Sequence, residues 1–171
     1  AYCANNPVNY TDPSGHYPME LSVKMYWFSL SKHKKRINLA NVSYINFSNV
    51  FKSRLKNSDR IYNIYKNLKK KLKKKKTVSF KPQKYIGFTE DKDLAYSVGH
   101  ISDFYMSVHK KNSIQFLVKL SLKDTYDFAK FSIRKQGVIK TFVNNFGGYY
   151  PQKGKVVHPY KWSFQTSFYR R

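Results

Sequence analysis

The sequence is poor in cysteine, glycine, proline and acidic residues, and these shortages exclude several classes of protein. Among its 171 residues Cys3 is the one cysteine, which excludes an intramolecular disulfide framework and a cysteine-based zinc site. Seven Gly and six Pro beside 41% hydrophobic and 18% aromatic residues indicate a packed core, unlike a disordered basic tail. No apolar run approaches the roughly 18–20 residues that cross a bilayer, and no signal-peptide pattern opens the chain, so we expect a soluble chain or one carried by something larger.

Acidic residues are the scarcest charged group, and this scarcity leaves a large positive charge. Nine Asp and Glu stand against 33 Lys and Arg, for a formal net charge of +24. Such an excess predicts a polyanionic partner, because Lys and Arg attract phosphates and release their counterions. Nucleic acid, an anionic membrane surface, wall teichoic acid and a pyrophosphate-linked lipid all fit; the alternative is that the charge serves solubility. A tightly bound acidic protein would also relieve the self-repulsion.

The first 18 residues, AYCANNPVNYTDPSGHYP, are typical of consecutive turns. They contain the pattern Y-x-x-N-N-P-x-x-x-x-D-P-x-G, formed by Tyr2, Asn5, Asn6, Pro7, Asp12, Pro13 and Gly15. This pattern resembles the signature that ends the conserved core of Rhs/YD-repeat proteins, where a repeat-built shell meets a variable C-terminal toxin. The resemblance implies that residues 1–18 are the end of the core and a linker. It also implies that the rest is toxin cargo of an Rhs shell, secreted or delivered into or onto a target bacterium and neutralised by a cognate immunity protein.

Apolar residues from Phe47 to Lys76 recur with helical spacing, so we expect a basic helical segment within residues 19–82. Ser48 and Ser58–Asp59 are the predicted N-caps. The helical pattern ends in a lysine cluster, which comprises Lys69, Lys70, Lys71, Lys73, Lys74, Lys75 and Lys76. We interpret this lysine cluster either as a solvated face or as a docking patch for an anionic surface, a nucleic acid or a partner protein.

Residues 83–171 show a different period, which predicts a β-rich unit that holds the candidate active site. Apolar residues alternate with polar ones around the Lys110–Ser113 turn, and this predicts an antiparallel hairpin whose second strand ends at Leu122. A short helix is expected from Val138 to Phe146, stopped by Gly147–Gly148, and a last strand from Tyr160 to Phe168. The expected fold class is α+β, with an N-terminal helical segment and a mainly antiparallel sheet crossed by one helix.

The few acidic residues gather at two places, Glu90–Asp93 and Asp124–Asp127. Asp124 and Asp127 stand where the predicted strand runs into a turn, which is a common place for catalytic groups. Two carboxylates three residues apart can share a Mg²⁺ ion, or one can act as general base while the other orients it. An aspartate-capped turn is the alternative explanation.

The string Asp124-Thr-Tyr126-Asp127-Phe128 resembles the D-x-Y-D-F motif of the colicin M family, bacteriocins that cleave the peptidoglycan precursor lipid II. The similarity covers residues 85–171 and implies a half-open, barrel-like α+β fold. It further implies Mg²⁺-assisted phosphodiester cleavage between lipid and pyrophosphate, with Asp124, Tyr126, Asp127 and Arg134 in the active site and the two aspartates as metal ligands.

The chain departs from that family at one position of the motif. The family has His-Arg where this sequence has Ile133-Arg134, and isoleucine cannot transfer a proton. Either His158 or His100 would have to supply the missing group, or the fold serves another reaction. Arg134 would clamp a phosphate or be one more exposed cation.

A ribonuclease or tRNase toxin acting in the target cytoplasm is the competing prediction. Metal-independent RNA cleavage needs a base, an acid and a cation, which His100 or His158, Tyr126 and a Lys or Arg would provide. A third class is membrane permeabilisation without catalysis through the lysine-rich helix. No P-loop, GxSxG, HExxH or Rossmann pattern supports other enzymes, and neither Glu20 nor Glu90 stands in a setting typical of ADP-ribosyl transfer. We expect a monomer.

Overall fold

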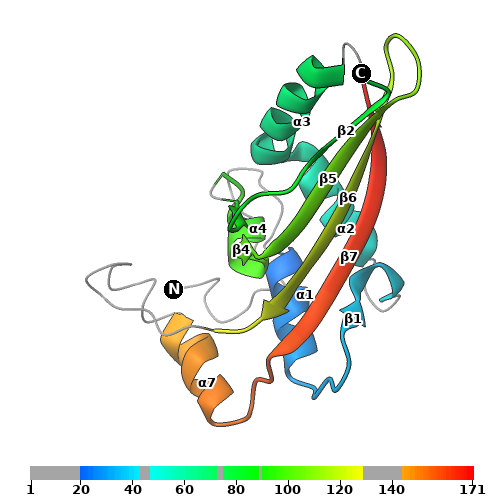
Figure 1. Cartoon of the computed structure of the whole chain (residues 1–171). Coiled ribbons are helices and arrows are strands. Elements are labelled where there is room, and N and C mark those ends of the chain that lie inside the picture. The colour runs from blue at the N-terminus through cyan, green and yellow to red at the C-terminus, as the bar shows by residue number, and fades with distance from the viewer. Residues whose placement is uncertain (1–19, 43–46, 73–74, 89, 129–143) are drawn as a thin grey trace.

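The computed structural model describes residues 20–42, 47–72, 75–88, 90–128 and 144–171 (Figure 1). Its helices are α1 (Glu20–Ser29), α2 (Phe47–Asn57), α3 (Asp59–Lys71) and α4 (Lys92–Ser97). A 3-10 turn covers Leu39–Asn41, and a π-helical turn, η5 (Asn145–Tyr149), runs directly into α7 (Tyr150–Lys153).

A five-stranded sheet forms the centre of the molecule, in the order β1-β7-β6-β5-β2. Its strands are β1 (Ile37–Asn38), β2 (Thr77–Phe80), β5 (Asp103–Lys110), β6 (Phe116–Tyr126) and β7 (Tyr160–Arg170). All neighbours are antiparallel except β1, which runs parallel to β7. A separate antiparallel ribbon pairs β3 (Ile86–Gly87) with β4 (His100–Ile101). The sheet stays open, and the α+β class with an N-terminal helical segment is confirmed.

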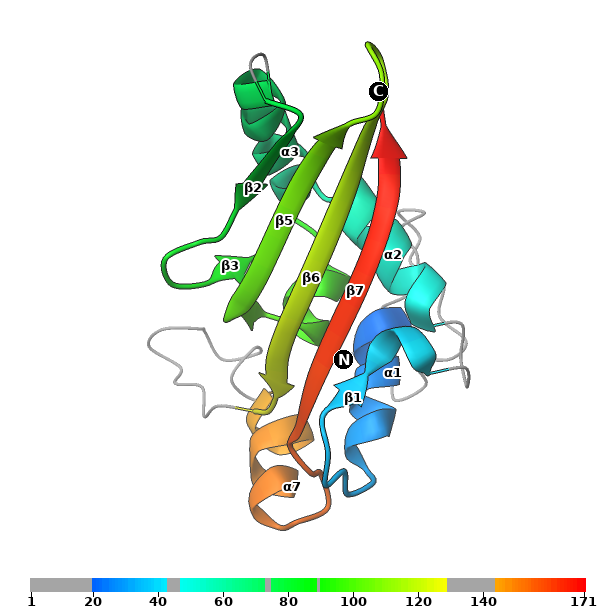
Figure 2. The same ribbon diagram turned by 45° about the vertical axis from the view of Figure 1, so that its right-hand side comes forward.

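The helices α1 to α4 lie on one side of this sheet, α7 lies beyond the end of β6, and Figure 2 shows the other face without a described helix over it. Alternation along the strands explains this arrangement, because every second residue of β6 from Phe116 to Leu122 is buried beneath the helices. Phe51 of α2 stacks on Phe164 of β7 at 4.6 Å between ring centroids and meets Trp162 edge-on at 5.9 Å. Residues of 19–82 and 83–171 therefore share a single hydrophobic core.

The helical pattern of residues 47–76 resolves into two helices. Ser58 caps α3 as predicted, because its hydroxyl accepts a hydrogen bond from the Ile61 N–H at 3.3 Å. The predicted cap at Ser48 is wrong, since α2 begins at Phe47 and Ser48 lies inside its first turn. After α3 the chain enters β2. This strand has only four residues, which is too short a pattern to predict a strand from the sequence.

The predicted hairpin is confirmed as β5 and β6, and the predicted last strand as β7. The expected end of the second strand at Leu122 is wrong, because β6 continues to Tyr126 along its partner β7. Of the helix expected from Val138 to Phe146, residues 138–143 lie outside the described ranges. Gly147 and Gly148 do not end a helix; η5 passes through both and continues into α7.

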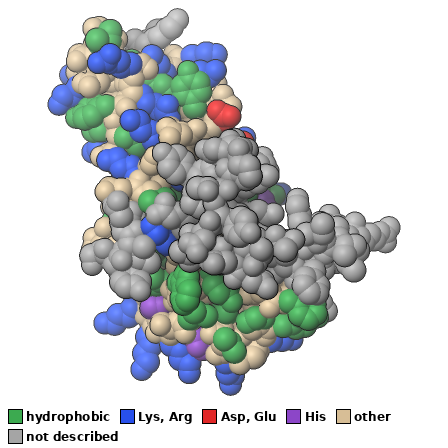
Figure 3. All heavy atoms as spheres, turned by 180° about the vertical axis from the view of Figure 1, so that it is seen from behind, with side chains coloured by type: hydrophobic (Ala, Val, Ile, Leu, Met, Phe, Trp, Pro, Cys, Tyr) green, Lys and Arg blue, Asp and Glu red, His purple; other side chains and the backbone are tan. Residues whose placement is uncertain are grey.

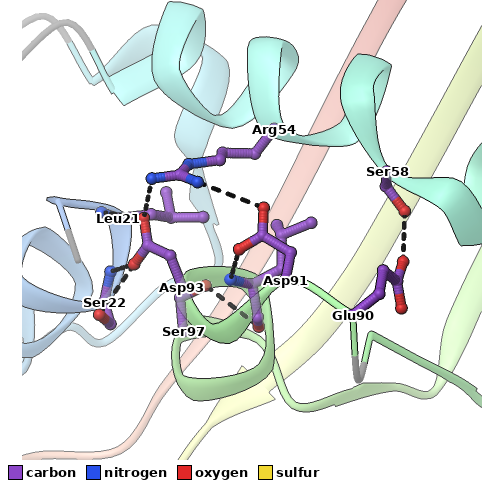
Figure 4. A network of polar contacts seen from close by, with 9 residues as sticks. Leu21, Ser22, Arg54, Ser58, Glu90, Asp91, Asp93 and Ser97 are labelled. Atoms are coloured by element: carbon purple, nitrogen blue, oxygen red, sulfur yellow. Dashed lines mark hydrogen bonds and ion pairs between the residues drawn. The ribbon is translucent and has the colours of Figure 1, made fainter. Parts of the chain in front are cut away.

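The acidic cluster at Glu90–Asp93 holds the helical layer together (Figure 4). Asp93, on α4, accepts hydrogen bonds from the backbone N–H groups of Leu21 and Ser22 at 3.0 and 2.8 Å, and so covers the N-terminus of α1. Asp91 caps α4 by accepting from Leu94 N–H at 3.0 Å. Arg54 of α2 bridges the two aspartates at 3.4 and 3.5 Å.

Glu90 extends the same arrangement to α3. Its carboxylate accepts hydrogen bonds from the Ser58 hydroxyl at 2.8 Å and from the Arg60 N–H at 3.1 Å. Negative charge at a helix N-terminus is favourable because it meets the free N–H groups and the positive end of the helix dipole. This cluster is therefore structural, and it leaves the other acidic cluster as the place to look for chemistry.

Candidate active site

Asp124, Tyr126 and Asp127 lie at the end of β6. Asp124 pairs with Trp162 and Tyr126 with Tyr160 in the register with β7. Asp124 and Tyr126 share the parity of the buried β6 residues, so both point to the helical side of the sheet. Asp127 is the first residue beyond the strand, and the structure thus gathers three of the predicted site residues at one end of the sheet.

Asp124 and Asp127 have no ion pair with a described residue, unlike Asp91, Asp93 and Asp103. Asp124 accepts a hydrogen bond from the Ser102 hydroxyl at 3.0 Å, and Asp127 has no hydrogen bond or ion pair with any residue that the structure describes. Asp103, by contrast, lies 4.0 and 3.9 Å from two lysines. Two carboxylates without a cationic partner among the described residues are unusual in a chain with 33 Lys and Arg.

The electrostatic setting of Asp127 is also unusual. Although Asp127 is exposed, desolvation by the surrounding groups raises the pKa of its carboxyl above the ordinary value, and the neighbouring negative charge of Asp124 raises it further. A strongly basic protein would be expected to lower the pKa of a carboxyl. The raised pKa makes Asp127 a better proton acceptor than an ordinary aspartate, which is a property of general bases.

Aromatic packing makes one wall of this site. The Tyr126 ring is 7% exposed, stacks on Tyr160 at 5.2 Å between centroids and meets Phe128 edge-on at 5.3 Å. The Tyr160 hydroxyl donates to the backbone oxygen of Met25 in α1 at 3.1 Å, and burial raises the pKa of Tyr160. These contacts give Tyr126 a packing role that fixes the end of β6.

The residue after Asp127 is held from the opposite side by η5 and α7. The Phe128 N–H donates to the side-chain oxygen of Gln152 at 2.9 Å. A Cβ at Gly148 would fall 2.0 Å from the Phe128 ring, so only glycine allows this close approach. Asp127 is thus held between a paired strand and an anchored aromatic ring.

The two candidate histidines are not joined to this carboxylate pair in the described part of the chain. The backbone N–H of His158 donates to the Ser29 oxygen at 2.6 Å, and its ring has no hydrogen bond to a described residue. His100 lies on the β3–β4 ribbon, edge-on to Tyr85 at 4.5 Å. Arg134 and the signature in residues 1–18 lie outside the described residues.

The lysine cluster lies at the C-terminal end of α3 and just beyond it. Lys69 makes a cation–π contact, because its ammonium lies 4.6 Å from the centre of the Phe116 ring. Lys70, Lys71, Lys75 and Lys76 are exposed, while Lys73 and Lys74 fall outside the described residues. Figure 3 shows Lys and Arg side chains spread over the visible described surface, with few acidic ones among them.

No group of three or more His, Cys, Asp or Glu side chains among the described residues is arranged to hold a metal ion. The Asp124–Asp127 pair still fits Mg²⁺, which prefers oxygen ligands and is usually held by one or two carboxylates together with water and substrate phosphates.

No helix in the described ranges combines the length and the hydrophobicity of a bilayer-spanning segment.

Several residues near this end of the sheet have no sequence signal. Ser102 and Gln152 reach the site from other elements, and His33 stacks on Phe28 beside Tyr160. His109, at the other end of β5, has a weak signal, because strand alternation places it on the helix-free face.

The chain was also compared with known proteins. A scan against protein-family models and searches of curated proteins and of solved structures found no match.

Proposed function

We propose that this chain is the toxin module of an Rhs-type antibacterial system and that it hydrolyses a phosphodiester bond in a lipid-linked pyrophosphate such as lipid II. The observation that carries the proposal is the Asp124–Asp127 pair: two adjacent carboxylates without a cationic partner among the described residues, in a chain of net charge +24. The D-x-Y-D-F motif supplies the substrate class, and the N-terminal Rhs-like signature supplies the biological role.

The proposed reaction uses Asp127 as general base. It takes a proton from water as the water oxygen bonds to phosphorus, and the ester oxygen leaves and is protonated as the alcohol. Asp124 keeps the pKa of Asp127 raised, and the Ser102 hydroxyl holds the Asp124 carboxylate in place. Asp124 would hold a Mg²⁺ ion together with water and substrate phosphates, which leaves Asp127 free as the base, and the ion would neutralise charge on the phosphate oxygens. The surrounding cations draw the anionic substrate to this end of the sheet.

The direct test is to incubate the protein with lipid II and Mg²⁺, and in parallel with total tRNA. We expect release of the lipid alcohol from lipid II and intact tRNA. Asp124→Ala is expected to reduce the lipid reaction, and Asp103→Ala, which removes a carboxylate from the other side of the sheet, serves as the matched control. Cleavage of tRNA with lipid II untouched would contradict the proposal.

A ribonuclease is the second candidate function, and the helix-free face of the sheet favours it. There His109 lies between two hydroxyls, with Thr77 Oγ1 2.9 Å from its Nδ1 and Ser107 Oγ 3.1 Å from its Nε2. Lys119 faces Ser107 in the register of β5 and β6. Tyr105 and Tyr169 are 43% and 48% exposed on the same face, where unpaired bases could stack.

In this alternative His109 would take the proton of a ribose 2′-hydroxyl as that oxygen bonds to the neighbouring phosphorus, and Lys119 would stabilise the developing charge. The bond from phosphorus to the 5′-oxygen of the next nucleotide would break, and that oxygen would leave as a hydroxyl after it takes a proton from water. His109→Ala separates the two candidates. It removes activity if RNA is cut on the sheet face and leaves lipid II hydrolysis unchanged if the carboxylate pair is the active site.

The pH profile gives a further prediction about the carboxylate pair. Asp127 must be ionised to accept a proton, so kcat/KM should fall as pH is lowered through its raised pKa. Asp124→Asn removes one cause of that raised pKa, and the acid limb of the profile should therefore move to lower pH. Measuring kcat/KM on lipid II across the acid range checks this; an acid limb that stays in place would show that the two carboxylates are not coupled in catalysis.

A further inference from the structure

A second group of functional side chains lies on the other side of the same sheet end. The turn between α1 and β1 carries the string His33-Lys34-Lys35-Arg36, and it folds against the first residues of β7. Together with Thr125 and Lys161, these residues line a cavity of about 280 Å³, which we call the basic pocket. Figure 3 shows histidine side chains among Lys and Arg side chains at the lower end of the molecule.

The walls of the basic pocket are fixed by contacts within the fold. Arg36 donates from Nη1 to the backbone oxygen of Trp162 at 2.9 Å. His33 lies with Nε2 2.8 Å from the backbone oxygen of Phe28, and its ring meets Tyr160 edge-on at 5.5 Å. Because a carbonyl oxygen only accepts, His33 Nε2 carries the proton of that hydrogen bond. Arg36 is thus held in place before any ligand arrives, whereas Lys34, Lys35 and Lys161 are exposed.

The pocket holds an excess of like charge without compensation from its lining. Lys34, Lys35, Arg36 and Lys161 surround it, and among the described residues no Asp or Glu lines it. Four cations around one small cavity repel one another, and a bound anion would relieve that repulsion. Arg and Lys donors with the Thr125 hydroxyl are the groups that bind phosphate oxygens in proteins.

We propose that the basic pocket binds a diphosphate group. Its volume lies just below the roughly 300 Å³ at which pockets begin to enclose drug-sized ligands, so it fits a compact head group and not a whole nucleotide or lipid. This inference rests on the proposed function for its role: it assigns the pocket to the pyrophosphate of the lipid-linked substrate.

The position of the pocket relative to the carboxylate pair supports this assignment. Thr125 stands between Asp124 and Tyr126 in β6, and alternation turns its side chain to the opposite face of the sheet. Thr125 also pairs with Lys161 across β6 and β7, one step from the end of the sheet. The ester bond that breaks belongs to this same diphosphate, so its phosphorus has to reach Asp127 from the pocket, and Thr125 lies only two residues before Asp127 at the end of β6.

The test is calorimetric titration of the whole chain with inorganic pyrophosphate. The double variant Lys34→Ala with Lys35→Ala should bind pyrophosphate at least tenfold more weakly, a loss of about 1.4 kcal/mol or more, because it removes two ammonium groups that would contact the phosphate oxygens. The control double variant Lys110→Ala with Lys111→Ala removes the same charge from the exposed β5–β6 turn and should keep wild-type affinity. Thr125→Val, which changes no charge, should also weaken binding.

Equal weakening in the pocket variant and the turn variant would overturn the proposal, because it would mean diffuse attraction to a basic surface. The same variants assayed on lipid II separate the two proposals. Pocket-dependent pyrophosphate binding without lipid II hydrolysis would support the pocket and contradict the proposed function. Lipid II hydrolysis with normal KM and undiminished pyrophosphate binding in the pocket variant would contradict the pocket and leave the function standing.

Discussion

Asp127→Asn is expected to lower the hydrolysis of lipid II by about 10²–10⁴-fold, the usual contribution of a general base. The asparagine side chain keeps the shape of the carboxyl but cannot accept the proton of the attacking water. Asp127 has no hydrogen bond or ion pair with a described residue that the substitution would break. The loss should therefore appear in kcat, measured with saturating substrate, while the far-UV circular dichroism spectrum stays unchanged.

The same variant should be at least as stable as the wild type at neutral pH. A carboxyl whose pKa is raised in the folded state holds its proton more tightly there than in the unfolded chain. The contribution of Asp127 to folding stability is complete below the ordinary Asp pKa and is lost as the pH rises through its raised pKa. At pH 7 Asp127 is ionised, and its charge destabilises the folded state. Asparagine carries no charge, and urea unfolding at pH 7 should show an unchanged or higher midpoint.

Asp103→Asn is the matched control for this substitution. It makes the same change of charge, but Asp103 is half-exposed and belongs to the helix-free face. Its hydrolysis of lipid II should equal that of the wild type. An inactive Asp127→Asn protein with a lower unfolding midpoint than Asp103→Asn would point to a structural role for Asp127 and would count against the general base.

The hairpin could be predicted from the sequence because its signal is local. Alternating apolar residues and a polar turn specify β5 and β6 without knowledge of other elements. The end of β6 could not be read in the same way, because Asp124 occupies an inward position and interrupts the apolar pattern. The strand continues there through its pairing with Trp162, which lies 38 residues away in the chain.

The helix stop predicted at the glycines is wrong, and nothing in the sequence predicted the role of the acidic cluster Glu90–Asp93; both have the same physical cause. Gly147 and Gly148 read as a helix stop by local propensity, yet η5 passes through them because the ring of Phe128 packs against Gly148. The partners of Asp93 lie 71 and 72 residues away, at the start of α1. Tertiary contacts of this kind override local preference and leave no periodic signal.

The candidate site was predictable in part. Scarcity drew attention to Asp124 and Asp127, and their lack of cationic partners among described residues distinguishes them from Glu90–Asp93, which looked equally conspicuous in the sequence. The basic string His33–Arg36 and the position of His109 on the open face depend on which strands become neighbours. Neither could be assigned to a site before β1 was placed beside β7 and β2 beside β5.

Asp93→Asn is expected to lower the free energy of unfolding by about 3 kcal/mol, the lower end of the cost of breaking a buried ion pair by removing one partner. The Asp93 side chain is 2% exposed, and both of its oxygens accept hydrogen bonds. An asparagine amide would turn an NH₂ group toward the N–H donors of Leu21 or Ser22, or toward Arg54. Two buried hydrogen-bond donors would then face each other, and the backbone N–H groups at the N-terminus of α1 would lose an acceptor.

The measurement is a pair of urea and thermal unfolding curves, in which Tm should fall by about 6–12 °C for a chain of this size. Asp103→Asn again serves as control, because its carboxylate is 47% exposed and 3.9–4.0 Å from its lysines, and an ion pair of that kind contributes roughly 1 kcal/mol or less. If Asp93→Asn unfolded no earlier than Asp103→Asn, the acidic cluster would not be holding α1, α2 and α4 together. The burial of a carboxylate would then need a functional explanation, and the separation of the two acidic clusters into a structural and a catalytic one would fail with it.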